Sequence, residues 1–443
     1  MSTAPPNQSI PLNIGLVGCG TVGSGVVQLL QSHGDLYEQR SGRRLNLRTI
    51  VVRDPKRTRK LNLDGITVTD DFSVIEQDPE IDVVVQVIGG IHPAQELMER
   101  SLNAGKDIIT ANKALLYEHG ASLFALAGRL GRTICFEAAV AGGIPIISAV
   151  TQALTANRIL SIEAILNGTS NFILSRMLDQ NQTYAEVLSE AQARGYAEAD
   201  PAMDVDGTDA AQKLAILTRL AFHTDVRLQD IVRQGIDRLQ LLDLEVAAEL
   251  GYRIKLLATS RLAADHLEVS VQPTLIRHDR PVAQTNGADN IVALIGDAVG
   301  LIRFSGAGAG QLPTASAVVA DLIDYATGRA ALTFQSLLRS QSGCPIPLQP
   351  AEDLSRRYYL RFTVEDRPHV LADLTDVLGR HQISISSVRQ DETPEESETG
   401  DCGLARLIIM THRTTEGRLR AADAEIAKLA CLRGERIRLP VAD

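Results

Sequence analysis

The sequence predicts an α/β protein in three parts: a nucleotide-binding α/β half, an α+β middle and a small α+β module at the C-terminal end. Three observations predict this fold class. A glycine-rich turn separates a strand-like run from a helix-like run near the N-terminal end. Strand-like and helical runs alternate through the middle, and residues 357–443 follow the order βαββαβ. At about 150 residues per domain, a chain of 443 residues has room for two or three domains.

Composition argues against several functional classes. A net charge of −10 argues against a nucleic-acid binder, which needs a basic face. No apolar run approaches the roughly 20 residues that a membrane span needs. Residues 1–11 are polar and lack the apolar region of a signal peptide, so we expect a short disordered lead-in. The five cysteines are scattered without a CxxC pair, which supports neither a disulfide framework nor a zinc site and fits a reducing cytoplasm.

The first motif is a dinucleotide-binding fingerprint, G-x-G-x-x-G, between a strand over Leu12–Val17 and a helix over Val22–Gln31. Gly18 permits the tight turn, Gly20 lets a pyrophosphate approach the backbone, and Gly23 lets the helix pack closely on the strand. The free N–H groups at the helix start favour a phosphate. A purely structural turn is the alternative. The candidate cofactor contacts are Gly18, Gly20, Thr21, Val22 and Gly23.

The second strand, Leu47–Val52, ends where a Rossmann fold recognises the adenosine ribose. Arg53 can pair with a 2′-phosphate, whereas Asp54 would favour the free hydroxyls of NAD. We expect NADP, with NAD as the alternative cofactor. A solvated basic loop would explain the same residues without a ligand.

Two further strands, Ile81–Ile88 and Asp107–Thr110, are predicted next, and the second leads into Lys113. Loops after parallel strands collect at the carboxyl edge of the sheet, where ligands bind. We therefore expect Lys113 where nicotinamide and substrate meet. The alternative is a solvent-exposed lysine at a helix start.

The segment from Gly195 to Lys213 concentrates five carboxylates, namely Glu198, Asp200, Asp204, Asp206 and Asp209. Asp209 and Lys213 are four residues apart, so both project from one face of a predicted helix over Asp209–Ala221. An acidic cluster suits a ligand with an ammonium group, and a lysine beside a carboxylate can transfer protons. The alternative is a capped helix with a surface ion pair.

Several blocks in chain order resemble homoserine dehydrogenases: residues 17–23, 87–94, 110–114, 136–145, 165–172, 195–213 and 306–321. The resemblance implies NAD(P)-dependent interconversion of L-homoserine and L-aspartate 4-semialdehyde, on the route to threonine, isoleucine and methionine. It implies that Lys213 is the proton donor and Lys113 a second essential lysine. It also implies substrate contacts, and positioning of substrate or lysine, from Tyr196, Glu198, Asp204 and Asp209.

The resemblance also implies a monovalent cation, sodium, in a loop that the residues alone describe as a glycine-rich turn packed on the sheet. The implied ligands are Glu137, Val140, Gly142 and Ile144. Carbonyl oxygens and a carboxylate suit a hard cation. The glycine-rich run at residues 306–313 is either a hinge or part of the cofactor site, with Gly308 as a candidate contact.

We assign residues 1–135, completed by about 306–335, to the nucleotide domain and 136–305 to an α+β substrate and dimerisation domain. A helix over Leu228–Leu242 is expected in the substrate domain, and one over Thr314–Tyr325 in the segment that completes the nucleotide domain. Residues 340–356 read as a linker. Residues 357–443 resemble an ACT domain, a ferredoxin-like module, and threonine is the implied effector. His369 replaces the glycine common in its first turn, so a purely structural role is the alternative.

Two other functions are compatible with the sequence. One is a different NAD(P)-dependent hydroxy-acid dehydrogenase with an ACT tail, although no histidine stands beside an acidic partner in the blocks above. The other is a non-catalytic sensor of cofactor or amino acid. The family resemblance implies a homodimer or homotetramer that acts on a small molecule. The net charge and the lack of a long apolar run argue against nucleic acid and membrane as partners.

Overall fold

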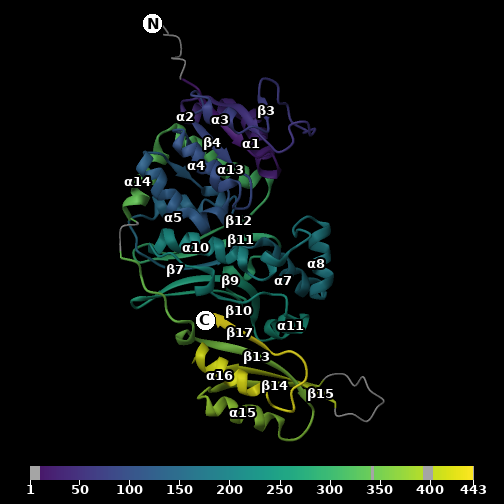
Figure 1. Cartoon of the computed structure of the whole chain (residues 1–443). Coiled ribbons are helices and arrows are strands. Elements are labelled where there is room, and N and C mark those ends of the chain that lie inside the picture. Colours follow the sequence, from purple (N-terminus) through teal and green to yellow (C-terminus); the bar gives the residue numbers. More distant parts are fainter. Residues whose placement is uncertain (1–9, 341–343, 393–402, 443) are drawn as a thin grey trace. The chain divides into compact units, whose positions relative to one another are not determined.

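The computed structural model describes residues 10–340, 344–392 and 403–442. The chain forms two compact units (Figure 1). The first holds residues up to 159, 212–225 and 294–345, and the second holds 160–211, 226–293 and the residues from 346 onward. No described helix is long and apolar enough to cross a membrane.

The first unit is built on a six-stranded parallel sheet in the order β3-β2-β1-β4-β5-β6. Its strands are β1 (Leu12–Val17), β2 (Leu45–Val51), β3 (Thr67–Thr69), β4 (Val83–Gln86), β5 (Asp107–Thr110) and β6 (Ile134–Cys135). The helices between them are α1 (Thr21–Ser32), α2 (Gly34–Ser41), α3 (Ser73–Gln77), α4 (Ala94–Asn103) and α5 (Lys113–Leu130). This strand order is that of a Rossmann fold, so the predicted fold class is confirmed.

A later segment of the chain completes the core of this unit. Helix α13 (Gln311–Ala326) packs against α1, and α14 (Arg329–Ser340) follows it. The contact is close, because a Cβ atom on Gly25 of α1 would lie 2.7 Å from the carbonyl oxygen of Gln311. Residues of α13 such as Val318 and Leu322 are fully buried together with the first strand. The observed helix begins earlier than the predicted one, which started at residue 314.

The second unit contains a mixed sheet in which neighbouring strands follow the order β7-β9-β10-β17-β13-β15-β14. These are β7 (Ile159–Ile165), β9 (Tyr252–Ala263), β10 (His266–Arg277), β13 (Ser355–Glu365), β14 (Ile385–Glu392), β15 (Leu404–Thr411) and β17 (Ile437–Ala442). The helices include α7 (Gly168–Gln180), α8 (Tyr184–Ala193), α9 (Ala202–Val205), α11 (Leu241–Glu249) and α12 (Pro281–Gln284). Helix α10 (Thr208–Phe222) begins in this unit and ends in the first.

The predicted helix over residues 228–242 is wrong. The structure has a short 3-10 turn, then strand β8 (Val232–Arg233) paired with β10, and helix α11 begins only at Leu241. Gly235 lies so close to the preceding segment that a Cβ there would be 2.6 Å from the carbonyl oxygen of Val205. Long-range packing therefore overrides the apolar spacing of this stretch.

The C-terminal module has the predicted order βαββαβ, with α15 (Val370–Arg380) and α16 (Glu416–Ile426) as its helices and a short strand β16 (Thr414–Thr415) before α16. Its last strand pairs in parallel with β10 of the substrate region. The residues before the module also lie on β10, because the Leu267 amide donates to Pro347 O and Leu267 O accepts from the Gln349 amide, both at 2.9 Å. The described part of the predicted linker is therefore fixed to the sheet, and β13 begins at Ser355, inside the predicted range 340–356.

Candidate active site

The glycine turn after β1 has the geometry that a bound dinucleotide needs. Gly18 has a φ of +97°, which L side chains rarely adopt. A Cβ on Gly23 would lie 2.1 Å from the carbonyl oxygen of Gly18, so only glycine fits there. A Cβ on Gly20 would have no heavy atom within 4 Å, which leaves its backbone open on that side. The first turn of α1, which contains Thr21 and Val22, has no acidic residue and no side-chain cap, so its N–H groups suit a phosphate.

The loop after β2 contains the positively charged Arg53 and the negatively charged Asp54, and the two residues differ in their contacts. The carboxylate of Asp54 accepts a hydrogen bond from the Lys56 amide at 3.0 Å, and its carbonyl accepts one from Arg59. Asp54 is therefore engaged within its own loop. Arg53 is exposed at the end of the strand. This arrangement presents a positive charge where a ribose phosphate would lie in a Rossmann fold.

Lys113 is the first residue of α5, and Asn112 fixes that helix start. The Asn112 side-chain oxygen accepts from the Leu115 amide at 3.1 Å, and its NH₂ group donates to Ile88 O at 3.1 Å and Gly90 O at 2.6 Å. The cap thus joins two loops at the carboxyl edge of the sheet. Lys113 itself is half-buried. The sequence reasoning missed Asn112, although asparagine before a helix is a strong capping signal.

The acidic segment divides into structural and candidate site carboxylates. Asp206 caps α10 by accepting from the Thr208 amide at 2.7 Å, and it also pairs with Arg233 at 3.2 Å. Asp200 accepts from the Ala202 amide at 3.1 Å, in the turn that leads into α9. The contacts of Asp206 are those that the capped-helix alternative predicts.

The remaining candidate site residues lie before and after Asp206 in the sequence. Asp209 is buried, whereas Glu198 is exposed. Lys213 is half-buried and lies one turn after Asp209 in α10. Tyr196 is 47% exposed, and its ring lies 4.9 Å from that of Phe172 in α7.

The first turn of α7 holds the acidic segment in place. Asn167 donates from its NH₂ group to Asp204 Oδ1 at 2.8 Å and to Asp209 Oδ2 at 2.9 Å. Thr169 donates to the carbonyl oxygen of Tyr196 at 2.7 Å. Asn167 and Thr169 were missed as site residues, and the only sequence signal was an Asn-Gly-Thr-Ser run at the start of a helix.

The loop that carries the implied cation ligands reverses direction at Ala141 and Gly142, which have φ values of +57° and +48°. It packs on the glycine-rich run, because a Cβ on Gly142 would lie 2.5 Å from Gly308 O. The carboxylate of Glu137 accepts from the Ile147 amide at 2.8 Å and the Ser148 amide at 2.7 Å. Glu137 therefore caps the short helix α6 (Ile146–Ser148), a role that the sequence reasoning did not foresee.

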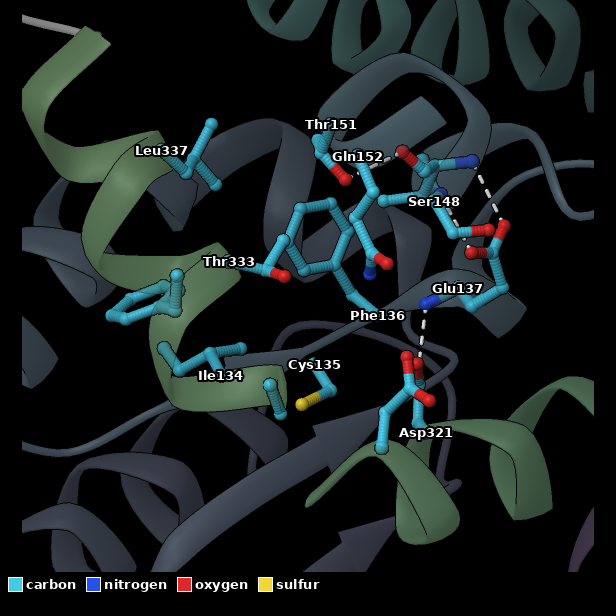
Figure 2. A pocket seen from close by; sticks show the side chains of 14 residues that line it. Ile134, Cys135, Phe136, Glu137, Ser148, Thr151, Gln152, Asp321, Thr333 and Leu337 are labelled. Carbon is cyan, nitrogen blue, oxygen red and sulfur yellow. Dashed lines mark hydrogen bonds between the residues drawn. The ribbon is translucent and has the colours of Figure 1, made fainter. Parts of the chain in front are cut away.

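A pocket beside this loop is lined by Cys135, Phe136, Glu137, Ser148, Asp321 and Phe334 among others (Figure 2). Asp321 accepts from the Glu137 amide at 3.0 Å. Burial raises the pKa of Asp321 well above its ordinary value, and the charge of Glu137 raises that pKa further. Burial likewise raises the pKa of Glu137. Among the described residues, no group of three or more His, Cys, Asp or Glu side chains could hold a metal ion, so a cation here would depend on carbonyl oxygens.

The Rossmann sheet and its glycine turn place the chain in the class of dinucleotide-binding α/β proteins. Residues 18–137 match the family described as "Homoserine dehydrogenase, NAD binding domain". Residues 145–323 match "Homoserine dehydrogenase", and residues 358–431 match "ACT domain".

Relatives extend this similarity over nearly the whole chain. A homoserine dehydrogenase of Pseudomonas aeruginosa is 41% identical over 97% of this chain and 99% of its own length. One of Synechocystis is 40% identical over 95% and 97%. The crystal structure of a homoserine dehydrogenase from Thiobacillus denitrificans matches with a TM-score of 0.90 and 41% identity, covering 98% of this chain and 99% of that one. The chain belongs to the homoserine dehydrogenase family.

Proposed function

We propose that the chain reduces L-aspartate 4-semialdehyde to L-homoserine with a reduced nicotinamide dinucleotide. The similarity over nearly the full length of homoserine dehydrogenases carries this proposal. The test is to follow NADPH absorbance with purified protein and either the semialdehyde or a set of 2-hydroxy acids and their keto acids. Turnover confined to the hydroxy acids would support the alternative function, a different NAD(P)-dependent hydroxy-acid dehydrogenase. Binding of NADPH without its oxidation by the semialdehyde would support the other alternative, a non-catalytic sensor of cofactor or amino acid.

We propose that Lys213 donates the proton and that Lys113 assists at the same oxygen. The bound cofactor supplies hydride to the aldehyde carbon, so negative charge grows on the carbonyl oxygen. An ammonium group stabilises that charge and supplies the proton. Lys213 follows Asp209 by one helical turn, which supports a carboxylate-assisted lysine.

The test of the lysines compares Lys213→Ala with Lys113→Ala. Loss of a general acid typically lowers the rate by about 10²–10⁴-fold, with cofactor binding retained. Lys60→Ala, a change in the exposed loop after β2, is the matched control. A Lys213→Ala protein with wild-type kcat would remove the proposed role of that lysine.

We propose that the exposed carboxylate of Glu198 holds the substrate ammonium group and that Tyr196, Asp204 and Asp209 position the substrate or the lysine. The hydrogen bonds that tie the acidic segment to α7 support a preformed site. Glu198→Gln is expected to raise KM more than it lowers kcat, because ammonium binding is made in both the ground state and the transition state. An unchanged KM would contradict this role.

We propose NADP as the preferred cofactor because Arg53 is exposed while Asp54 is engaged in its own loop. Arg53→Ala should weaken NADPH binding without weakening NADH binding, since only NADPH carries the 2′-phosphate. An equal effect on both cofactors would contradict the proposal. Arg57→Ala, in the same exposed loop, is the control.

We propose a sodium ion at the loop of Glu137, Val140, Gly142 and Ile144. The donor chemistry fits, because carbonyl oxygens and one carboxylate suit a hard monovalent cation. Such an ion would hold the loop against the glycine-rich run and offset the buried charge of Glu137. The melting temperature should rise when sodium replaces tetramethylammonium at constant ionic strength, and Glu137→Gln should abolish that rise.

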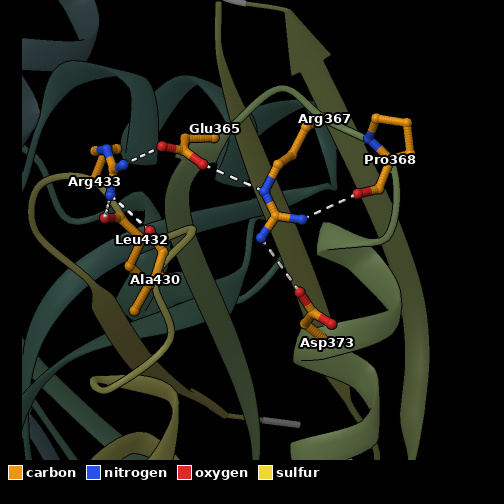
Figure 3. Close-up of polar contacts among 7 residues, drawn as sticks. All are labelled: Glu365, Arg367, Pro368, Asp373, Ala430, Leu432 and Arg433. Atoms are coloured by element: carbon orange, nitrogen blue, oxygen red, sulfur yellow. Dashed lines mark hydrogen bonds and ion pairs between the residues drawn. The ribbon is translucent and has the colours of Figure 1, made fainter. Parts of the chain in front are cut away.

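We propose threonine as the effector of the C-terminal module. His369 stands at the turn before α15 with a φ of +72°, where glycine is favoured. Arg367 braces the same turn by donating to Glu365 and Pro368 O and pairing with Asp373 at 3.6 Å (Figure 3). Threonine titrations of the wild type and His369→Gly, read by calorimetry and activity, test the effector. Absence of binding in both proteins would favour the purely structural role.

We propose a homodimer or homotetramer. Around the turn between β11 (Asp289–Gly296) and β12 (Gly300–Ala307), the apolar side chains of Ile295, Val299 and Leu301 are exposed. Exposed apolar side chains that gather on one surface are typical of contacts between proteins. Light scattering should give a mass of at least two chains, and Leu301→Glu should lower it.

A further inference from the structure

Asn167 occupies a position from which one side chain reaches three groups. It is the residue before α7, and its side-chain oxygen accepts from the Ser170 amide at 2.7 Å. Its NH₂ group donates to Asp204 Oδ1 at 2.8 Å and to Asp209 Oδ2 at 2.9 Å. Asn167 is 4% exposed and Asp209 is 5% exposed, so water does not readily replace these bonds.

The helix cap determines which way the amide faces. A backbone N–H can only donate, so the amide oxygen must face Ser170 and the NH₂ group must face the carboxylates. A primary amide has two N–H bonds, and here each serves one carboxylate. Two neighbouring carboxylates otherwise raise each other's pKa, because each charge disfavours the other. The N–H groups of Asn167 donate to one oxygen of each carboxylate and so stabilise the ionised form of both.

The backbone of the acidic segment is held by the same helical turn. Ser170 Oγ donates to the carbonyl oxygen of Asp204 at 2.7 Å. Thr169 Oγ1 donates to the carbonyl oxygen of Tyr196 at 2.7 Å. The polar side chains of residues 167, 169 and 170 thus contact the acidic segment at three places, namely Tyr196, Asp204 and Asp209. Gly168 leaves room for this turn, since a Cβ there would lie 2.6 Å from Ala288 O.

We propose that Asn167 is a positioning residue that keeps Asp204 and Asp209 ionised and oriented for the reaction. This inference rests on the proposed roles of those two carboxylates. Without the two N–H donors, one carboxylate retains its proton to a higher pH. The acidic limb of the pH profile of kcat/KM therefore moves to higher pH, and kcat falls because the carboxylates lose their fixed orientation.

The test uses Asn167→Ser in the full chain. Serine is as good a helix cap as asparagine, so α7 keeps its start, but a hydroxyl has one hydrogen and a shorter reach. We expect NADPH affinity to stay close to wild type and a cooperative melting transition at a somewhat lower temperature, because two hydrogen bonds to carboxylates are lost. We expect kcat to fall roughly ten- to a hundredfold, the scale of a misplaced reacting group, and the acidic limb to move to higher pH. Asn181→Ser, which changes the exposed cap at the other end of the helix, is the control.

Two results separate this inference from the proposed site. If Asp204→Asn and Asp209→Asn both keep wild-type kinetics, the proposed roles of these carboxylates are wrong. If those variants lose activity while Asn167→Ser keeps the wild-type kcat and pH profile, the positioning role is overturned and the site stands. A variant that loses activity with an unmoved acidic limb and an early melting transition shows a structural role only, which also overturns the inference.

Discussion

A buried ion pair inside the second unit gives a measurable test of how the C-terminal module is attached. Arg361 of β13 pairs with Asp243 of α11, with Nε at 2.6 Å from Oδ1 and the second nitrogen at 3.2 Å from Oδ2. Their side chains are 1% and 0% exposed. Asp243 also accepts from the Tyr359 hydroxyl at 3.1 Å and the Gln240 amide at 2.9 Å.

Arg361→Met removes the cation and, among the described residues, leaves the buried carboxylate with the Tyr359 hydroxyl and the Gln240 amide as donors. Breaking a buried pair in this way costs about 3–5 kcal/mol, which is a large part of the 5–15 kcal/mol that typically separates folded from unfolded states. The double change Asp243→Leu with Arg361→Met removes both charges, so we expect it to cost less than Arg361→Met alone.

The assay is denaturation by urea, followed by far-ultraviolet circular dichroism because the sequence contains no tryptophan. Free energies of unfolding for the wild type, the two single variants and the double variant complete the cycle. If Arg361→Met lowers the free energy of unfolding by less than about 1 kcal/mol, the pair contributes no more than a solvent-exposed ion pair, and the reasoning is refuted. A double variant with the summed cost of the two single variants would refute the coupling.

Three further changes test other parts of the structure. Gly23→Ala should destabilise the protein because its Cβ would lie 2.1 Å from a carbonyl oxygen, whereas Gly20→Ala should melt within a few degrees of wild type and mainly weaken NADPH binding. Burial lowers the pKa of Lys255 from 10.5 to about 8. Between these two pH values the unfolded chain holds a proton on Lys255 that the folded chain has lost. The free energy of unfolding should therefore rise with pH across this range, by up to about 3 kcal/mol. The same rise in Lys255→Met would contradict this assignment. Asp321→Asn keeps the acceptor but removes a buried carboxylate whose pKa is raised, so it should be more stable than wild type at neutral pH, and urea titrations should show the difference shrinking as the pH falls.

The sequence predicted the parts of the fold that depend on local chemistry. The glycine turn was recognisable because each glycine answers a separate steric need, and the structure has a positive φ at Gly18 and a close contact at Gly23. The module order βαββαβ followed from apolar spacing. Residues 228–242 were mispredicted because the fit of Gly235 against the Val205 carbonyl depends on tertiary packing.

The contacts around the candidate site could not be predicted for a similar reason. Asn167 lies 37 and 42 residues before the two carboxylates that it binds. Arg361 lies 118 residues from Asp243. Neither pairing has a local sequence signature, whereas the capping roles of Asp206 and Asn112 do.

The pairing of β17 with β10 has a consequence for truncation experiments. A shortened chain that ends before residue 355 would lose β17 and leave Leu275 and Ile276 of β10 without their paired strand. Bare strand edges recruit other chains, so such a fragment is expected to aggregate. Loss of activity in the fragment would therefore report a damaged sheet, and point substitutions within the module are the cleaner way to study regulation.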